Sequence, residues 1–242
     1  MSRSSARGLL ALSMLGFLCS CAGTTSRSGG RDKMAEIGDP EAAIQAAQAA
    51  LAANPEDSAA KFRLGLAFAK LADATAPGEP QKALRDSARV ALESVVEAEP
   101  KNVEARVHYG LVLEDLGRLS DAVAQYDEAH EIAPEDPVPL VNKGALLYFN
   151  EKKTFEAKEV LMQALALDPD NANAHFNLGV LFADANMFHE AKVEWERVMK
   201  VAPEGTPARN LAAENLERVN ALLAGNTAAD SGVKAPDDGH GH

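Results

Sequence analysis

Cysteine and aromatic residues are scarce in this sequence. Of its 242 residues, two are cysteines, and both lie near the N-terminus at Cys19 and Cys21. A disulfide framework or a cysteine-based metal site in the rest of the chain is therefore excluded. Aromatic residues make up 5% of the chain, whereas glycine and proline recur at intervals instead of in runs. This composition favours closely packed helices over sheets, so the expected fold class is all-α.

Basic residues are also few, because acidic residues outnumber them. The chain has 24 lysine and arginine residues against 36 aspartate and glutamate residues, for a formal net charge of −12. Because phosphate binding depends on clustered basic side chains, this balance argues against a nucleic-acid surface. It argues equally against a body that lies flat on anionic lipid.

The N-terminus combines basic residues with a short apolar run. Arg3 and Arg7 precede an apolar stretch from Leu9 to Leu18, which is the pattern of a secretory signal. The stretch is too short to span a bilayer, which takes about 20 apolar residues. We therefore interpret residues 1–20 as a cleaved signal peptide.

The sequence Leu18-Cys19-Ser20-Cys21 resembles the lipobox of bacterial lipoproteins. The resemblance implies a lipid on Cys21; the alternative is an ordinary cleaved signal with two incidental cysteines. Ala22 follows the cysteine, and the resemblance then favours a lipid anchor in the outer membrane, on its periplasmic face. Residues 21–38 are rich in threonine, serine and glycine and are expected to form a flexible tether with a span of roughly 20–25 Å.

Prolines and glycines mark an internal repeat. The prolines are spaced by 45, 34, 35 and 34 residues, and the glycines by 45, 34 and 35 residues. Two residue types therefore share one period, which indicates repeated helical hairpins with a proline after each second helix. The marks are Pro55, Pro100, Pro134, Pro169 and Pro203, together with Gly65, Gly110, Gly144 and Gly179.

The pattern within each period resembles the tetratricopeptide repeat. In the second unit, Gly110 is followed by Leu116-Gly117-Arg118, Ala122 and Tyr126, and the other units repeat this order of small and large residues. The resemblance implies a right-handed superhelical solenoid of helix-turn-helix units, with four full units over about residues 56–203. Glycine and alanine are expected where the two helices of a unit cross most closely.

Single helices flank the four units. Asp39-Pro40-Glu41 is a helix start that leads into a lone second helix ending at Ala53. The segment from Thr206 to Ala224 is predicted to be a capping helix that ends near Gly225 and shields the last unit from water. The solenoid is thus expected over residues 39–224, and a disordered tail over residues 225–242. The tail carries His240 and His242, which could chelate a metal weakly, but a solvated terminus is the favoured interpretation.

The first unit contains eleven more residues than the others, around residues 72–80 between its two helices. Such an insertion is expected to lie on a loop. It is either a contact point for a partner or a tolerated loop, and we favour the second interpretation because long surface insertions cost little free energy.

The first helices of the units are predicted to line a concave groove. The functional interpretation is an apolar slot for a peptide or amphipathic helix of a partner. The alternative is that much of this ridge is packing between units, or is covered by a terminal helix. The extra residue of the third unit leaves open which of two neighbouring aromatic residues belongs to the groove. The candidates are Phe62, Leu66, Val107, Leu111, Val141, Tyr148, Phe149, Phe176 and Val180, edged by Lys70, Glu114, Asp115, Asn142, Asn177 and Asp184.

Signals for catalysis are missing. There is no glycine-rich phosphate loop, no zinc-binding His-Glu-x-x-His helix and no Gly-x-Ser-x-Gly turn. The histidines His108, His130, His175 and His189 have no spacing that suggests a metal site. We therefore expect neither an enzyme nor a cofactor, and enzymatic activity is the least favoured of three hypotheses.

A secreted, lipidated solenoid of this kind resembles the pilotins of type IV pilus systems and the lipoproteins of motility complexes. The resemblance implies a lipid-anchored scaffold or assembly factor whose partners are envelope proteins, such as a secretin, pilus or motility components. Pilotins of this type have more repeats than the four found here. The alternative hypothesis is an adaptor that regulates a cell-wall hydrolase or an envelope protease.

Overall fold

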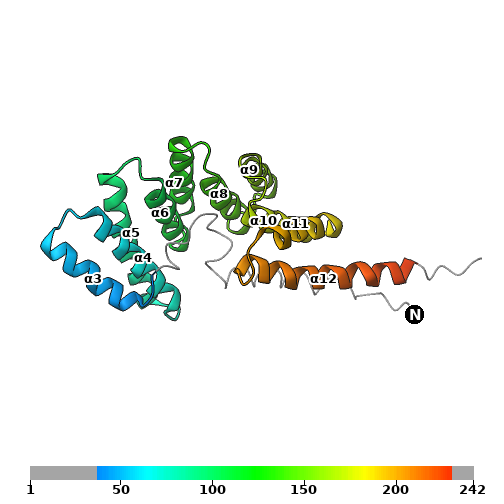
Figure 1. Ribbon diagram of the computed structural model, residues 1–242, viewed down its shortest axis with the longest axis horizontal. Helices are drawn as coiled ribbons and strands as arrows, with labels where there is room; N and C mark the ends of the chain where they lie inside the picture. The colour runs from blue at the N-terminus through cyan, green and yellow to red at the C-terminus, as the bar shows by residue number, and fades with distance from the viewer. Residues whose placement is uncertain (1–36, 231–242) are drawn as a thin grey trace, which may run out of the picture.

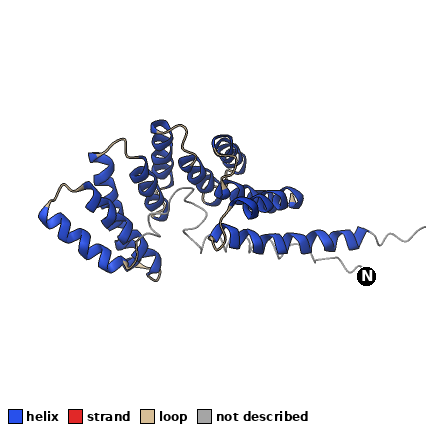
Figure 2. Ribbon diagram, viewed as in Figure 1, coloured by secondary structure: helices blue, strands red, loops and turns tan. Residues whose placement is uncertain are grey.

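The protein is a curved stack of helical hairpins (Figure 1). The computed structural model describes residues 37–230, with the surroundings of side chains described up to residue 224. Within these limits it contains helices and no strand, as the all-α prediction requires (Figure 2). The helices are α3 (Pro40–Ala53), α4 (Ser58–Ala74), α5 (Glu79–Ala98), α6 (Val103–Asp115), α7 (Leu119–Ile132), α8 (Val138–Phe149), α9 (Thr154–Leu167), α10 (Ala172–Asp184), α11 (Phe188–Val201) and α12 (Pro207–Asp230).

The four predicted units correspond to the pairs α4–α5, α6–α7, α8–α9 and α10–α11. Three of the first helices start on an Asp or Asn whose side chain accepts a hydrogen bond from a backbone N–H three residues on, at 2.9–3.0 Å. Such caps stabilise a helix by about 1 kcal/mol each. The capping residues are Asp57, Asn102 and Asn171.

The repeated glycines lie where the two helices of a unit touch, as predicted. A Cβ atom added at Gly65 would come within 2.6 Å of the Leu92 side chain, and one at Gly179 within 2.4 Å of Trp195. The large residue of each second helix therefore fills the space that a side chain on the first helix would need. The other two pairs are Gly110 with Tyr126 and Gly144 with Leu161.

The insertion in the first unit lengthens its helices instead of forming a long loop. Helix α4 has 17 residues and α5 has 20, whereas α6 has 13 and α7 has 14. Of residues 72–80, the structure leaves only 75–78 outside the helices. The expectation of a loop was therefore wrong for most of the insertion. The reason is that the alanine-rich end of α4 continues to favour helix until Pro77 and Gly78 break it.

The extended hairpin is tied to itself and to the next unit. Gln81 Nε2 donates hydrogen bonds to the carbonyls of Ala72 and Thr75, at 3.0 and 3.1 Å. Arg85 Nη1 donates to the carbonyl of Asp115 in the second unit, at 3.4 Å. These contacts make the extra turns a rigid part of the stack.

The last helix, α12, covers the end of the stack as predicted. Leu211, Leu216 and Val219 pack with the apolar side chains of α10 and α11 in one core cluster that includes Trp195. The helix continues through Gly225 to Asp230, six residues past the predicted end at Ala224. A single glycine costs only about 1 kcal/mol in a helix, and no proline follows at once to stop the chain.

Candidate partner-binding surface

The first helices α4, α6, α8 and α10 lie along the inner side of the arc, and the second helices lie outside them (Figure 1). Neighbouring first helices are in direct contact from one unit to the next. In a surface built in this way, equivalent positions of the first helices face the same side in each unit. We call the inward-facing side of these four helices the inner surface.

Most of the nine predicted groove residues are packed between units. Six of them expose 7% or less of their surface. Tyr148, Phe176 and Val180 share one apolar cluster, while Val141 packs with Leu161 and Leu178 in another. This burial favours the alternative interpretation of the ridge as inter-unit packing. The buried six are Leu66, Val107, Val141, Tyr148, Phe176 and Val180, and the partly exposed three are Phe62, Leu111 and Phe149.

The extra residue of the third unit lies in the turn between α8 and α9. Both α8 and α10 end five residues after their glycine, at Phe149 and Asp184, so the two helices keep the same register. Tyr148 and Phe149 therefore both belong to the inner surface. The Tyr148 ring is buried and its hydroxyl donates to the Asp184 carboxylate, whereas the Phe149 ring meets it edge to face at 4.9 Å and stays partly exposed.

A row of buried neutral polar side chains crosses the inner surface. His108, Asn142 and Asn177 each lie two residues before the glycine of their unit, on α6, α8 and α10, and all three are buried. Asn142 Nδ2 donates to the carbonyl of Val138 at 3.0 Å, and its buried Oδ1 has no hydrogen-bond partner within the described structure. Because this acceptor is covered by the protein itself, it costs free energy of folding and is not an open contact point for a partner.

His108 is the member of this row that the sequence interpretation treated as an ordinary helical histidine. Burial lowers the pKa of His108 to about 4, so its ring is neutral at physiological pH. The ring meets Phe62 of the preceding first helix edge to face, with centroids 5.7 Å apart. Its spacing of 34 residues from Asn142 was the signal that could have identified it.

Charged groups edge the inner surface and are mostly acidic. Tyr126 donates from its hydroxyl to Glu114 at 3.4 Å, and the Lys70 ammonium donates to the carbonyl of Ile37. Of the charged residues that were predicted to edge the groove, three are carboxylates, Glu114, Asp115 and Asp184, and one is basic, Lys70. A partner segment with neutral or basic character fits this edge better than an acidic one.

The described part of the chain was also expected to contain no metal site, and the predicted lipid anchor lies outside it. The described part of the chain holds no group of three histidine, cysteine or acidic residues arranged to bind a metal ion. Within residues 37–230, none of the helices is long and apolar enough to cross a membrane. The predicted signal, Cys21, the tether up to residue 36 and the tail from residue 231 lie outside the described residues.

Comparison with family models gives two descriptions of the same repeat. Residues 35–84 and 81–137 match a model described as a tetratricopeptide repeat, and residues 145–185 match a second described as a TPR repeat. The fold and the inner surface define a helical-repeat solenoid. The sequence matches specify its type: the chain is built of tetratricopeptide repeats.

Solved structures agree on the fold. A thermophilic TPR protein of Thermus thermophilus superposes with a TM-score of 0.62 at 20% identity, over 85% of this chain and 99% of that one. YrrB, described as a TPR protein with an unusual peptide-binding site, gives a TM-score of 0.50 at 20% identity, over 75% of this chain and 85% of its own. At these identities the likeness shows the fold alone.

Curated relatives include two cytochrome c-type biogenesis proteins named CycH. The protein from Pseudomonas aeruginosa is 27% identical over 129 residues, and that from Rhizobium meliloti is 31% identical over 111 residues. These matches cover 52% and 45% of this chain but only 32% and 29% of the relatives. The chain therefore corresponds to about a third of either relative.

Proposed function

We propose that this protein is a lipid-anchored scaffold that holds a partner protein of the cell envelope against its inner surface. The observation that carries the proposal is the recurring register of the first helices, which leaves Phe62, Leu111 and Phe149 partly exposed along the inner surface. An apolar face of a partner helix or peptide can pack on such side chains without any chemical step. The lipid on Cys21 would raise the local concentration of the scaffold at one leaflet.

Two envelope machines are proposed as the setting. The first is assembly of a type IV pilus secretin or a motility complex, which the lipobox and the repeat suggest together. The second is cytochrome c maturation, which the similarity to the two CycH proteins supports. Regulation of a cell-wall hydrolase or envelope protease is a third outcome that the same experiment detects.

The test is affinity capture from envelopes with the full lipidated chain and two matched variants. Leu111→Glu with Phe149→Glu places carboxylates on partly exposed inner positions, while Phe155→Glu places one on α9 at a side chain that is 87% exposed. We expect the inner double variant to lose the captured partner and the Phe155 variant to keep it. Identification of the partner by mass spectrometry then assigns the machine. Equal capture by both variants would exclude the inner surface as the binding site.

The lipid anchor is tested separately. Cys21→Ser removes the thiol that carries the lipid, so we expect the chain to leave the membrane fraction in high-salt buffer without detergent. Retention in that fraction would contradict lipidation of Cys21. A Cys19→Ser chain serves as the control and should stay with the membranes.

A further inference from the structure

Among residues 37–230, two helices at opposite ends of the stack lack the hairpin partner that the other helices have. Helix α3 precedes the first unit and packs against α4, in the position of a second helix, and the described residues contain no first helix to pair with it. Helix α12 follows the last unit and packs against α11 and α10, in the place of a first helix whose second helix is missing among the described residues. One end therefore offers half a unit and the other end offers the complementary half.

The proline spacing gives α12 the register of a first helix. Arg106 in α6 and His175 in α10, each four residues before the glycine of its unit, bond to the carbonyl of the proline six residues earlier at 3.0 Å. Arg209 in α12 likewise lies six residues after Pro203, and its guanidinium donates to the carbonyls of Met199 and Ala202 at the end of α11. Four residues after Arg209 comes Ala213, which therefore occupies the glycine position.

The open face of α3 has the register of a second helix. Pro55 and Pro100 are 45 residues apart, so Ala43, Ala47 and Ala50 correspond to three residues of α5. Those three are buried against α4 in the first unit; they are Ala88, Leu92 and Val95.

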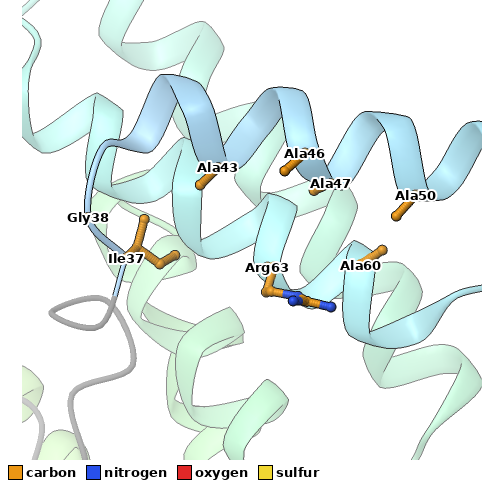
Figure 3. Close-up of a pocket in the computed structure, with 8 residues that line it drawn as sticks. All are labelled: Ile37, Gly38, Ala43, Ala46, Ala47, Ala50, Ala60 and Arg63. Atoms are coloured by element: carbon orange, nitrogen blue, oxygen red, sulfur yellow. The ribbon is translucent and has the colours of Figure 1, made fainter.

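In α3 the same positions line an open cavity of about 360 Å³ (Figure 3). Ala43, Ala46, Ala47 and Ala50 come from α3, and the Arg63 side chain reaches into the cavity from α4 (Figure 3). The cavity thus lies where the missing first helix would pack.

The two open faces carry small residues at the contact. In each complete unit a glycine faces a large residue of the second helix, and a Cβ atom would clash at 2.4–2.7 Å. The two open faces have Ala213 at the glycine position and Ala47 at the large-residue position. An alanine pair fills less space than a glycine–leucine pair, so it fits without a clash and lets the two helices approach more closely.

Charge also matches across the proposed contact. Between α8 and α10, Tyr148 of one first helix bonds to Asp184 of the next. Counted from the glycine position, the residue that corresponds to Tyr148 in α12 is Glu217, and the one that corresponds to Asp184 in α4 is Lys70. Opposite charges therefore occupy the two positions that would meet.

We propose that the chain associates head to tail, with α12 of one copy packing into the open face of α3 on a second copy to complete a fifth unit. The occupant is a second copy of this chain because both its register and its charge are complementary to the slot. The contact joins two different surfaces, so it leaves one open end on each side and allows assembly beyond a dimer. It goes beyond the scaffold function and does not require the lipid or an envelope partner.

The first experiment is cysteine cross-linking in the full chain with Cys19→Ser and Cys21→Ser, so that no native thiol remains. One preparation carries Ala47→Cys and another carries Ala213→Cys. We expect a disulfide-linked dimer when the two are mixed under mild oxidation, and none above background from either alone. As a matched control, Ala49→Cys lies on α3 at an exposed position outside the cavity. Linkage that is equally strong with Ala49→Cys, or absent from the mixture, would overturn the proposal.

The second experiment uses sedimentation to detect association without a cross-link. The same cysteine-free chain is expected to show a mass above its 25.6 kDa monomer that rises with concentration. Glu217→Lys should shift the chain to the monomer, and Glu217→Lys combined with Lys70→Glu should restore association. Circular dichroism confirms that each variant is helical. A monomer at every concentration, or a double charge swap that restores nothing, contradicts the head-to-tail contact.

Ala47→Trp tests the alternative occupants. A tryptophan in the cavity should abolish association, while Ala49→Trp should leave it intact. If the unsubstituted chain is monomeric and Ala47→Trp only lowers its melting temperature, the cavity is filled by another segment of the same chain and the proposal fails.

Discussion

Burial of His108 makes the stability of the fold depend on pH. The ordinary pKa of His108 is 6.5, and burial lowers it to about 4 in the folded protein. The unfolded chain therefore binds a proton between these two values where the folded chain does not. Since stability rises with pH wherever the unfolded state binds more protons, acidification from pH 6.5 toward 4 destabilises the fold.

The size of the effect follows from the shift. The lowered pKa of His108 corresponds to a loss of roughly 3 kcal/mol once the pH is below both values, at about 1.4 kcal/mol for a tenfold change in proton affinity. At pH 5 the same relation gives a loss of about 2 kcal/mol relative to pH 8. This loss is large compared with the total stability of about 5–15 kcal/mol that is typical of a domain.

The substitution that isolates this effect is suggested by the repeat itself. The third and fourth units have Asn142 and Asn177 in the register of His108, so His108→Asn introduces a side chain that already fits this position. We expect the stability advantage of His108→Asn over the unsubstituted chain to grow by about 2 kcal/mol between pH 8 and pH 5. The difference between the two chains cancels the contribution of every other titrating group that both contain.

The assay is urea unfolding of both chains at several pH values, followed by far-UV circular dichroism. Each pair of curves must be compared for slope as well as midpoint, because repeat arrays do not always unfold as one unit. Two curves of stability against pH that run parallel would refute the reasoning. An NMR titration in which the His108 ring titrates near its ordinary pKa would refute it as well.

Three further predictions concern stability. Gly179→Ala places a Cβ atom 2.4 Å from Trp195, so we expect a loss of about 1–3 kcal/mol in urea unfolding, with quenching or shift of the tryptophan fluorescence. Asn102→Ala removes the cap of α6 and should cost about 1 kcal/mol, measured in the same way; an unchanged midpoint would contradict the cap. Burial pulls the pKa of His175 down, but hydrogen bonds with Glu194 and a proline carbonyl outweigh it, and the pKa is raised. Its stabilisation should be complete below pH 6.5 and vanish as the pH rises through the raised value, and His175→Gln should remove that dependence.

The parts of the fold set by local rules could be predicted from the sequence. Spacing located the hairpins because each glycine must meet a large residue one helix away, as Gly179 meets Trp195. Asp39 was expected to begin α3, and its side chain accepts a hydrogen bond from the backbone of Glu41 at 3.1 Å. Both features depend on contacts within one unit or one turn, which a single sequence displays.

The inner surface was harder to predict because it depends on contacts between units. Val107 and Leu111 both recur on the inward side of α6, yet the first is buried and the second is partly exposed. The difference arises from how closely α4 and α8 approach α6, and helical spacing alone carries no information on that distance. His108 was missed for the same reason: its role depends on side chains one unit away in the sequence.

A side-chain hydrogen bond from a first helix to a backbone carbonyl before it recurs along the stack. We expect the stack to be weakest at the unit that lacks this bond. In α6, α10 and α12 the residue four positions before the glycine position holds a carbonyl of the preceding turn; these residues are Arg106, His175 and Arg209. In α8 the same position holds Leu140, whose side chain can donate no hydrogen bond. The joint between the second and third units therefore depends on apolar packing at this point, and its polar contact is instead the ion pair of Lys143 in α8 with Asp127 in α7.

Hydrogen exchange can measure that difference at three equivalent amides. The backbone N–H groups of Asn102, Asp136 and Asn171 each donate to the carbonyl three residues earlier, at 2.9, 3.0 and 3.1 Å. Asn102 and Asn171 cap their helices whereas α8 begins after Pro137, so the most direct comparison is the protection of Asp136 with and without the substitution of Leu140. We expect Asp136, beside Leu140, to exchange faster than the other two, and Leu140→Arg to slow it by supplying the missing donor. If Asp136 is as protected as Asn102 and Asn171, these side-chain hydrogen bonds do not set the rigidity of the joints, and packing between the units alone controls the curvature of the inner surface.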